Sequence, residues 1–457
     1  MKRVWCYTIA VGSLMIYASN VEAVTRYAKS DGTGSGPCLT WATACTLTNA
    51  LTQAATGDEI WVKSGAYGPF TLKNGVKTIG GFAGTESLAS QSDPTTNQTV
   101  IDGRVIGTDN PASTVLRGFT IRNGNGGADG VGGGMILNNS NALIVQCIFE
   151  DNTANDFGGA VAIRSGGSPQ FINCTFRNNG QGAANPAETN GGGAVFVREG
   201  APSFVNCLFT NNKAWEGGVV MMVSGTPTFV NCTVVNNQAT IGYGGVFFDP
   251  EGRATFRNCV LRSNTTTKGV GRYDQGYSGS GGTTLITSSN VRDGWTGTGN
   301  IDADPLFQNP ATGNYELQST SPCKNVGENA GLPLDVGDLD WDGNTTEALP
   351  MDLARHGRVR WGTVDMGAYE LGCQAASTDC DQNGFVDACE IEADPTLDCH
   401  NQNGVLDLCE TNGVPKWACC VGFTCTYPTT SCRCVASGGV WYLKKTCNQV
   451  TCGYSEN

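Results

Sequence analysis

The sequence predicts an all-β protein built as a parallel β-helix, a solenoid of stacked coils. Three observations support this: the glycine content, the low charge and an internal repeat. Of 457 residues, 63 are glycine and 15% are charged, against about 7% glycine and about 25% charge in ordinary proteins. Such a chain is rich in turns and short strands. The repeat then decides between the turn-rich folds.

Two short sequence motifs, called phrases here, alternate along residues 133–264. One phrase holds a cysteine and apolar residues, with an asparagine three residues after the last apolar position, and the other is a Gly-Gly pair before an apolar run. The cysteines are spaced by 27, 33, 25 and 27 residues. The members are Cys147, Cys174, Cys207, Cys232 and Cys259; Asn152, Asn179, Asn212, Asn237 and Asn264; and the pairs that begin at Gly133, Gly158, Gly192, Gly217 and Gly244.

Each repeat alternates period-2 strands with glycine and asparagine turns, which indicates strands rather than helices. One unit is too short to bury a face by itself, so the units must stack on one another. The leucine spacing of a leucine-rich repeat is missing, and a propeller blade needs roughly 40 to 50 residues. A parallel β-helix remains, with like residues about 4.8 Å apart and earlier coils at Ile60–Phe82 and Val100–Ile121.

Stacking predicts a role for each repeated residue. We expect the five repeated cysteines to be free, buried thiols, because neighbours in register lie slightly beyond disulfide distance. A metal or redox array would need histidines or a Cys-x-x-Cys motif, and neither accompanies them. The repeated asparagines should bond the turn backbone of adjacent coils. Cys38 and Cys45 are close enough in sequence to form a local disulfide in an exported protein.

The N-terminus predicts export. Lys2 and Arg3 precede the apolar run Val4–Ala18, and Val21-Glu22-Ala23 provides a cleavage site, so residues 1–23 form a signal peptide. The run is shorter than the ~20 apolar residues that span a bilayer, so no membrane span is expected after cleavage. The mature protein should be secreted and extracellular, either free or associated with the cell surface. A net charge of −13 argues against nucleic acid as a partner.

The repeat phrases resemble those of right-handed β-helix proteins of the pectate-lyase-like superfamily and of polymorphic outer-membrane proteins. Flanking motifs, such as Gly80–Glu86, Asp302–Phe307 and Val364–Glu370, resemble bacterial surface proteins with a choice-of-anchor Q domain. The resemblance implies a right-handed parallel β-helix at residues 58–265, after an N-terminal cap at 24–57, and an anchor-Q-like extension at 266–372. The pattern departs at Cys323-Lys324-Asn325.

The outward positions of the Gly-Gly strands suggest two candidate surfaces. Val161, Val195, Val220 and Phe247 form an apolar stripe at alternate positions, which we expect to bind a partner or a covering loop, and Trp215 could stack on a sugar or anchor its loop. Charged residues at the strand ends are either solvated edge charges or, if the protein is an enzyme, a catalytic groove. These are Arg164, Arg198, Glu199 and Asp249.

Residues 373–410 are acidic and carry two calcium-loop patterns. The first has oxygen ligands at EF-hand spacing around a glycine, and the second is one residue longer. The pair resembles dockerin and thrombospondin type 3 repeats, which implies structural calcium. A partial third copy, Asp338–Gly343, is interpreted as a turn. The proposed ligands are Asp379, Asp381, Asn383, Phe385, Asp387 and Glu390, then Asn401, Asn403, Val405, Asp407 and Glu410.

Residues 411–457 hold seven cysteines and resemble a short disulfide module of secreted bacterial proteins. Cross-links are expected there, because so small a segment can hardly build its own core. The catalytic signatures of galacturonases and of a major pectate lyase family are missing from the chain. We therefore expect an exported, non-enzymatic β-helix protein that binds a polysaccharide or a cell-surface protein. The alternative is a polysaccharide lyase or glycoside hydrolase of the same superfamily.

Overall fold

The computed structural model describes residues 23–181, 191–249, 254–267, 276–278, 284–359 and 362–371. Farther along the chain it describes only the backbone of three antiparallel strands, β35 (Trp417–Val421), β36 (Thr424–Thr429) and β37 (Val440–Tyr442). The described residues contain one α-helix, α1 (Leu47–Gln53), beside many short strands. None of their helices combines the length and the apolar character that crossing a membrane requires.

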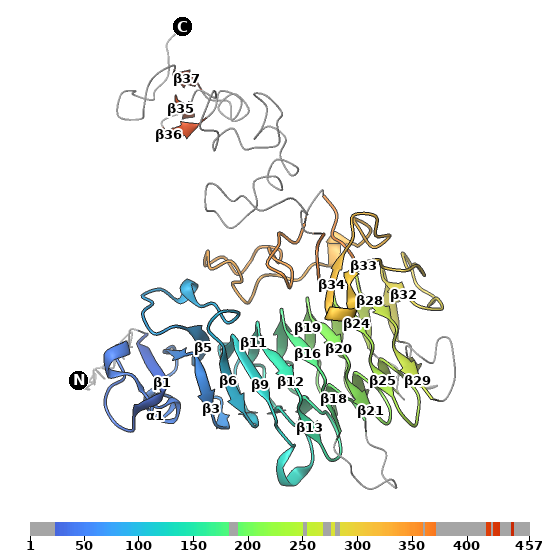
Figure 1. Cartoon of the computed structure of the whole chain (residues 1–457), viewed down its shortest axis with the longest axis horizontal. Coiled ribbons are helices and arrows are strands. Elements are labelled where there is room, and N and C mark those ends of the chain that lie inside the picture. Colours follow the sequence, from blue (N-terminus) through green and yellow to red (C-terminus); the bar gives the residue numbers. More distant parts are fainter. Residues whose placement is uncertain are drawn as a thin grey trace, which may run out of the picture.

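The strands form three long parallel sheets that run the length of a rod (Figure 1). Neighbours in each sheet come from successive repeats, and all of these pairs are parallel. The first sheet holds β1 (Thr25–Thr33), β2 (Glu59–Lys63), β5 (Lys77–Phe82), β8 (Val115–Arg117), β11 (Leu143–Val145), β15 (Gln170–Ile172), β19 (Ser203–Val205), β23 (Thr228–Val230), β27 (Thr255–Arg257) and β31 (Leu285–Thr287).

The second sheet lies next along each coil. It holds β3 (Gly65–Tyr67), β6 (Thr99–Asp102), β9 (Phe119–Arg122), β12 (Ile148–Glu150), β16 (Thr175–Arg177), β20 (Leu208–Thr210), β24 (Thr233–Val235), β28 (Val260–Arg262) and β32 (Asn290–Val291). The third sheet completes the coil. It holds β4 (Phe70–Thr71), β7 (Val105–Thr108), β10 (Met135–Asn138), β14 (Val161–Arg164), β18 (Val195–Val197), β22 (Val220–Met222), β26 (Phe247–Asp249) and β30 (Gly276–Ser278).

Two-residue strands close the later coils into a fourth, narrow sheet. These are β13 (Thr153–Ala154), β17 (Gly180–Gln181), β21 (Lys213–Ala214), β25 (Gln238–Ala239) and β29 (Thr265–Thr266). The architecture confirms the predicted all-β, right-handed parallel β-helix. The coils continue to Val291 on β32, so the rod extends beyond residue 265, the end that the sequence resemblance implied.

The N-terminal cap covers the open end of the rod. Helix α1 begins after Thr46, whose hydroxyl accepts a hydrogen bond from the amide of Asn49, and it buries Leu47, Ala50 and Leu51 against the first coil. Strand β1 adds to β2 in parallel register, so the first coil has a partner on that edge. The predicted disulfide between Cys38 and Cys45 is present and fastens the loop before the helix.

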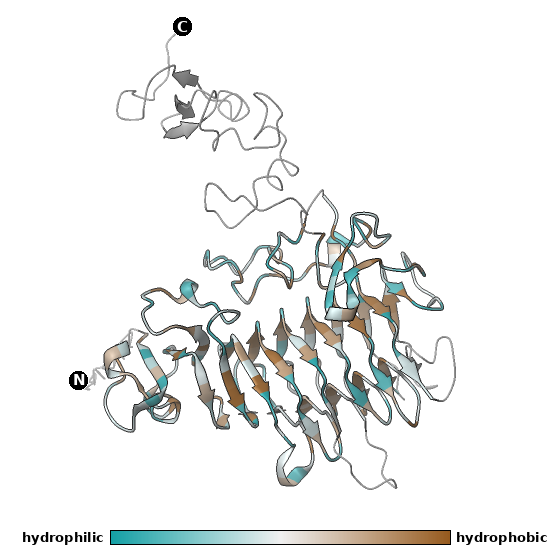
Figure 2. Cartoon of the chain, viewed as in Figure 1, coloured by the Kyte–Doolittle hydropathy of each residue, from teal (hydrophilic) through white to brown (hydrophobic). Residues whose placement is uncertain are grey.

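The core consists of ladders of like side chains. Phe149, Phe176 and Phe209 stack with centroids 4.9 and 4.6 Å apart, and a second phenylalanine ladder lies beside them. The five repeated cysteines are wholly buried and free, as predicted. Brown, apolar colour therefore lies mainly on the stacked strands in Figure 2, with teal at many of the loops.

The repeated asparagines form the predicted structural ladder. In each step the side-chain amide donates to the next asparagine's Oδ1, at 2.9 Å from Asn212 to Asn237. The same amide nitrogen also donates to a carbonyl of the preceding coil, 2.9 Å from Asn212 to Phe176. The bonds satisfy polar groups that burial would otherwise leave unpaired.

A second polar row explains the residue before each cysteine. Gln146, Asn173, Asn206, Asn231 and Asn258 all have φ between 51° and 53°. This left-handed conformation is several-fold enriched in asparagine, and it turns the chain from the first sheet into the second. Three members of this row, Asn173, Asn206 and Asn258, donate from their side chains to carbonyls of residues 328–352, in the C-terminal segment described next.

The C-terminal segment, residues 323–359 and 362–371, runs back along the outside of the rod (Figure 1, orange). It follows the hairpin β33 (Phe307–Asn309) and β34 (Asn314–Leu317). Leu339 and Leu349 pack on the outer face of the first sheet, against Leu143, Val145 and Ile172. The segment thus covers an apolar strip that a solenoid of this kind would otherwise expose.

Candidate functional site

The prediction of the apolar binding stripe is wrong, because it is displaced by one residue along each strand. Val161, Val195, Val220 and Phe247 are wholly buried and belong to the core of the rod. A period of two gives the alternation but not its phase, and a shift of one residue exchanges the two faces. The outward positions are instead occupied by Ile136, Ala162, Phe196, Met221 and Phe248.

These outward apolar residues are covered by the protein's own loops. Phe196 is only 4% exposed, and its ring stacks on Phe157 with centroids 4.6 Å apart. Val131 belongs to the same cluster. The face therefore offers no open apolar surface to a partner over these residues. Trp215 is half-buried, and its carbonyl accepts hydrogen bonds from Ile241 and Gly242, at 3.2 and 2.8 Å, which makes it part of a loop anchor.

The predicted charged edge is only partly assembled. Arg164 and Arg198 lie on neighbouring rows at the ends of β14 and β18, with the amide of Arg198 donating to Ile163 at 3.0 Å. Arg164 is engaged by Asp129 at 3.1 Å, whereas Arg198 and Glu199 are exposed.

The prediction that Asp249 lies at this charged edge is wrong. Asp249 is 2% exposed, and its Oδ2 accepts from the amide of Ala254 and the hydroxyl of Thr284 at 3.3 and 3.2 Å. Asp249 lies two residues after the inward Phe247, so the strand alternation turns it inward too. The four residues named for an enzymatic groove therefore do not meet. The eleven calcium ligands predicted from Asp379 to Glu410 lie outside the described residues.

Two hollows flank the β33–β34 hairpin where it lies on the second sheet. Their volumes are about 450 and 560 Å³, within the range of small-molecule sites. Asn236, Pro310 and Tyr315 line both of them, so the hollows adjoin. The first also includes Val235, Arg262, Ser263, Arg292, Asp304, Pro305, Leu306, Phe307 and Gln318; the second, Thr175, Arg177, Asn178, Leu208, Thr210, Asn211, Ala311, Thr312 and Gly313.

The wall between the hollows is preformed. Tyr315 is 3% exposed, its hydroxyl lies 3.1 Å from Thr210 Oγ1, and it accepts from Asn236 Nδ2 at 3.0 Å. Its ring meets Phe307 edge-on, with centroids 5.3 Å apart. These contacts join the hairpin to β20 and to the turn after β24. A ligand would therefore not have to order this wall on binding.

The lining of the hollows is cationic although the protein is acidic. Arg177, Arg262 and Arg292 line them, against one carboxylate, Asp304. All three arginines are paired with carboxylates outside the lining. Arg177 pairs with Glu150 and Arg262 with Asp302, each at 2.5 Å, and Arg292 pairs with Asp293 at 3.6 Å. Guanidinium groups held in this way are oriented donors for carboxylate or sulfate oxygens.

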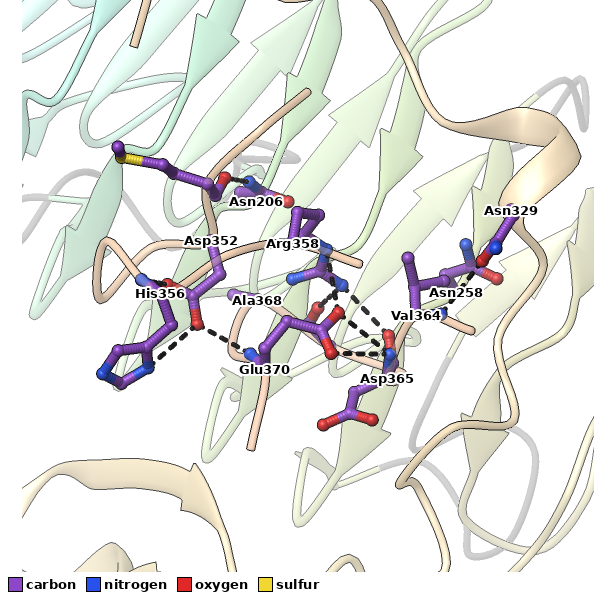
Figure 3. Close-up of polar contacts among 12 residues, drawn as sticks. Asn206, Asn258, Asn329, Asp352, His356, Arg358, Val364, Asp365, Ala368 and Glu370 are labelled. Carbon is purple, nitrogen blue, oxygen red and sulfur yellow. Dashed lines mark hydrogen bonds and ion pairs between the residues drawn. The ribbon is translucent and has the colours of Figure 1, made fainter. Parts of the chain in front are cut away.

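A buried charge cluster, here called the clasp, ties the C-terminal segment together (Figure 3). Arg358, Glu370, Asp365 and Asp352 are all wholly buried. Arg358 Nη2 donates to the carbonyls of Asp365 and Gly367 at 3.0 and 2.9 Å. Glu370 accepts from the amide of Asp365 at 3.0 Å, while its own amide donates to Asp352 at 2.7 Å.

Burial sets the electrostatics of the clasp. It raises the pKa of Glu370 to about 8, with Asp365 adding to the effect and Arg358 opposing it. Burial likewise raises the pKa of Asp365. Perturbed carboxyl groups often mark active sites, but these side chains have no exposed surface. We therefore assign the clasp to structure, as the fastening of the segment.

The C-terminal segment also explains the second polar row of the coils, because three of its carbonyls accept hydrogen bonds from that row. Asn173 and Asn206 donate to the carbonyls of Asp352 and Met351, each at 2.7 Å, and Asn258 donates to that of Glu328 at 3.0 Å. Sequence reasoning identified the Val364–Glu370 motif by resemblance but not its partners. Arg358 and Asp352 belong to no repeat, so no sequence signal marked them. The hollows were missed as well, because the hairpin and the sheet that form them are distant in sequence.

A comparison with known protein families agrees with the fold. A family model described as "Right handed beta helix region" matches residues 104–292. No curated protein matches the chain. Among solved structures, the crystal structure of the pectate lyase Pel9A is similar at 12% identity, covering 76% of this chain and 96% of that chain. Its TM-score is 0.37, a likeness too weak to carry an argument about function.

Proposed function

We propose that this protein is an exported β-helix scaffold that binds an acidic polysaccharide without cleaving it. The binding site is the pair of hollows beside the β33–β34 hairpin. The observation that carries the proposal is the cationic lining: three arginines and one carboxylate line the hollows of a chain whose net charge is −13. A surface that departs from the protein's overall sign favours a ligand of opposite charge.

The shape of the site suits a polymer rather than a compact ligand. The two hollows share Tyr315 and Asn236, so one linear chain could pass both of them. Hydroxyl and amide groups, among them Thr210, Asn178 and Asn211, line the second hollow. Such groups can both donate to and accept from sugar hydroxyls, while the arginines meet the acidic groups.

Export is part of the proposal and is supported by the Cys38–Cys45 disulfide, because disulfides persist in oxidising compartments. The signal peptide at 1–23 supports it independently. The calcium repeats at 373–410 and the cysteine-rich module at 411–457 would then form a tail stabilised by calcium and cross-links. Together these features fit a protein that works outside the cell or at its surface.

Binding of polygalacturonate and alginate by the mature chain tests the proposal, with a neutral glucan for comparison. We expect binding to the acidic polymers that weakens as salt is raised. Arg177→Ala and Arg292→Ala should each lower the affinity about tenfold, the value of one charge-assisted contact. Arg122→Ala is the matched control, since Arg122 is also paired, with Asp102 at 2.9 Å, but does not line the hollows.

Other outcomes of the experiment would reject the proposal. Equal affinity for acidic and neutral polymers, or equal losses in Arg177→Ala and Arg122→Ala, would exclude the hollows as the site. New reducing ends or unsaturated sugar products would show catalysis. If that turnover were lost in Arg198→Ala, the strand edge with Arg164 and Glu199 would be the active site instead.

A further inference from the structure

A cluster of carboxylates lies in the middle of the C-terminal segment, between Asp335 and Glu347. One oxygen of each of Asp335, Asp340 and Glu347 lies within 4.8 Å of the other two. Asp338 and Asp342 form a second such group, which shares Asp340. Five acidic side chains are thus gathered in a short stretch, where the sequence alone indicated a turn.

The cluster alone would be unremarkable, but two of its oxygens are buried without a hydrogen-bond partner. Asp335 is wholly buried; its Oδ2 accepts from the amide of Leu339 at 2.7 Å, whereas its Oδ1 has no partner. Glu347 repeats the pattern: Oε2 accepts from Asn344 Nδ2 at 3.1 Å, and Oε1 is buried and unpartnered. A buried, unpaired carboxylate oxygen is costly unless a cation or donor meets it.

A neighbouring cation, Arg117 on β8, does not meet this need by direct contact. Its guanidinium donates to the carbonyls of Gly337, Asp338 and Leu339 at 3.0, 2.9 and 3.4 Å and to Gln146 at 2.9 Å, and it forms no ion pair with these carboxylates. Burial and the neighbouring Asp340 and Asp338 raise the pKa of Asp335 to about 6. The loop therefore concentrates negative charge that the described protein groups do not neutralise by direct contact.

We propose that Asp335, Asp340 and Glu347 bind one calcium ion, with Asp338 and Asp342 supplying further carboxylate oxygens around it. An all-oxygen set with several carboxylates on an irregular loop is the donor chemistry that calcium takes, since it accepts six to eight oxygens in irregular geometry. Magnesium demands a near-ideal octahedron and retains water, which favours calcium here. The site is separate from the calcium repeats expected at 373–410.

Calcium binding by the mature full-length chain tests this site, by calorimetric titration after chelator treatment. Because the tail is also expected to bind calcium, each variant is compared with the wild type. Asp340→Asn, which alters both groups of carboxylates, should lose one equivalent of calcium, and Asp335→Asn should lose it or bind it at least about tenfold more weakly. Asp151→Asn is the matched control, an exposed aspartate with φ of 54° that asparagine also adopts.

Stability gives a second readout that does not depend on counting ions. In chelator, Asp340→Asn should melt at a higher temperature than the wild type, because one of the repelling charges is gone. In calcium the order should reverse, because only the wild type gains stability from the ion. Asp151→Asn should follow the wild type in both conditions.

The proposal fails if Asp340→Asn and Asp335→Asn retain every calcium equivalent with unchanged affinity, or if the stability order is the same with and without calcium. Should Asp340→Asn not fold, Glu347→Gln replaces it, since Glu347 is only partly buried and the amide keeps its shape. Loss of one equivalent in that variant supports the site, and an unchanged titration overturns it.

Discussion

Arg358 Nε lies 3.3 Å from Glu370 Oε1, and neither side chain has any exposed surface. Glu370 nevertheless has a pKa raised to about 8, because burial outweighs the nearby guanidinium. In the folded protein the group therefore keeps its proton to a higher pH than it does in the unfolded chain, whose reference value is 4.5. The burial of the Glu370 carboxyl thus links the fastening of the C-terminal segment to pH.

The first prediction is that stability falls as pH rises from about 5 to 8. A raised pKa means that the folded state binds more protons in this window, so the free energy of unfolding decreases by up to about 1.4 kcal/mol per pH unit. Glu370→Gln should flatten this slope above about pH 6; below that pH Asp335, whose pKa burial raises to about 6, contributes a slope of the same sign in both proteins. Urea unfolding midpoints at several pH values, in chelator, measure it. Groups with lowered pKa values, such as Asp93 at about 2, act only below this window.

Glu316→Gln is the control for this prediction, since Glu316 is a half-buried glutamate on β34 in the same extension. It should retain the slope of the wild type. A Glu370→Gln variant with an unchanged slope would show that Glu370 titrates normally. Asp365, whose pKa is raised as well, would be the next group to examine.

The second prediction concerns Gly367, which brings the backbone of the segment against the second sheet. Its φ is +105°, and a Cβ there would lie 2.8 Å from Thr233 Oγ1 and 3.2 Å from Val260 Cγ2. Gly367→Ala should therefore destabilise the protein by about 3 kcal/mol, from strain and from displacement of the segment. Thermal unfolding of the purified variant measures the loss.

Gly313→Ala separates the two causes. Gly313 has φ of +84° but has no atom within 4 Å of the added Cβ, so only the backbone strain applies, about 1 kcal/mol. Equal losses in the two variants would mean that the segment does not press on the sheet at Gly367.

The third prediction addresses the asparagine ladder. Asn237 donates to the carbonyls of Phe209 and Val235, both at 3.0 Å, and to Asn264 at 2.9 Å. Asn237→Ala would remove these bonds and would leave the backbone amide and the side-chain amide of Asn212 without the Asn237 oxygen to which both donate at 2.9 Å, so we expect a loss of about 3 kcal/mol. Asn125→Ala is the comparison, because Asn125 is exposed and accepts a single bond from Gly127. A loss no greater than that of Asn125→Ala would contradict a structural ladder.

The fourth prediction is that the ladder thiols are inert until the rod unfolds. The five repeated cysteines and Cys323 are buried and free, and burial raises the pKa of Cys323 to about 11. In native, unreduced protein an alkylating reagent should leave all six unmodified, and in denaturant it should modify all six. Peptide mass mapping identifies each site, and a disulfide between any two of them would refute the prediction.

Repetition decided how much could be predicted from the sequence. The cysteine and asparagine ladders were predicted correctly because five copies fix their spacing, and the inward direction of the cysteines followed from the residue type, since free cysteine is among the most buried residues. The stripe through Val161 and Val195 was not, because alternation has no absolute phase until one inward residue is known. Arg358, Asp352 and the hollows around Tyr315 depend on an irregular segment packing on distant coils, and no local pattern encodes such contacts.

The path of the C-terminal segment has a consequence for how the rod folds and comes apart. In most solenoids each repeat touches only its neighbours, so the ends fray and the array unfolds piecemeal. Here the C-terminal segment contacts Arg117 on an early coil, Asn173 and Asn206 on middle coils, and Asn258 on a late coil. The coils between these contacts are coupled into a single cooperative unit. This unit can be completed only after the chain has been synthesised through residue 371 and the C-terminal segment has packed on the rod.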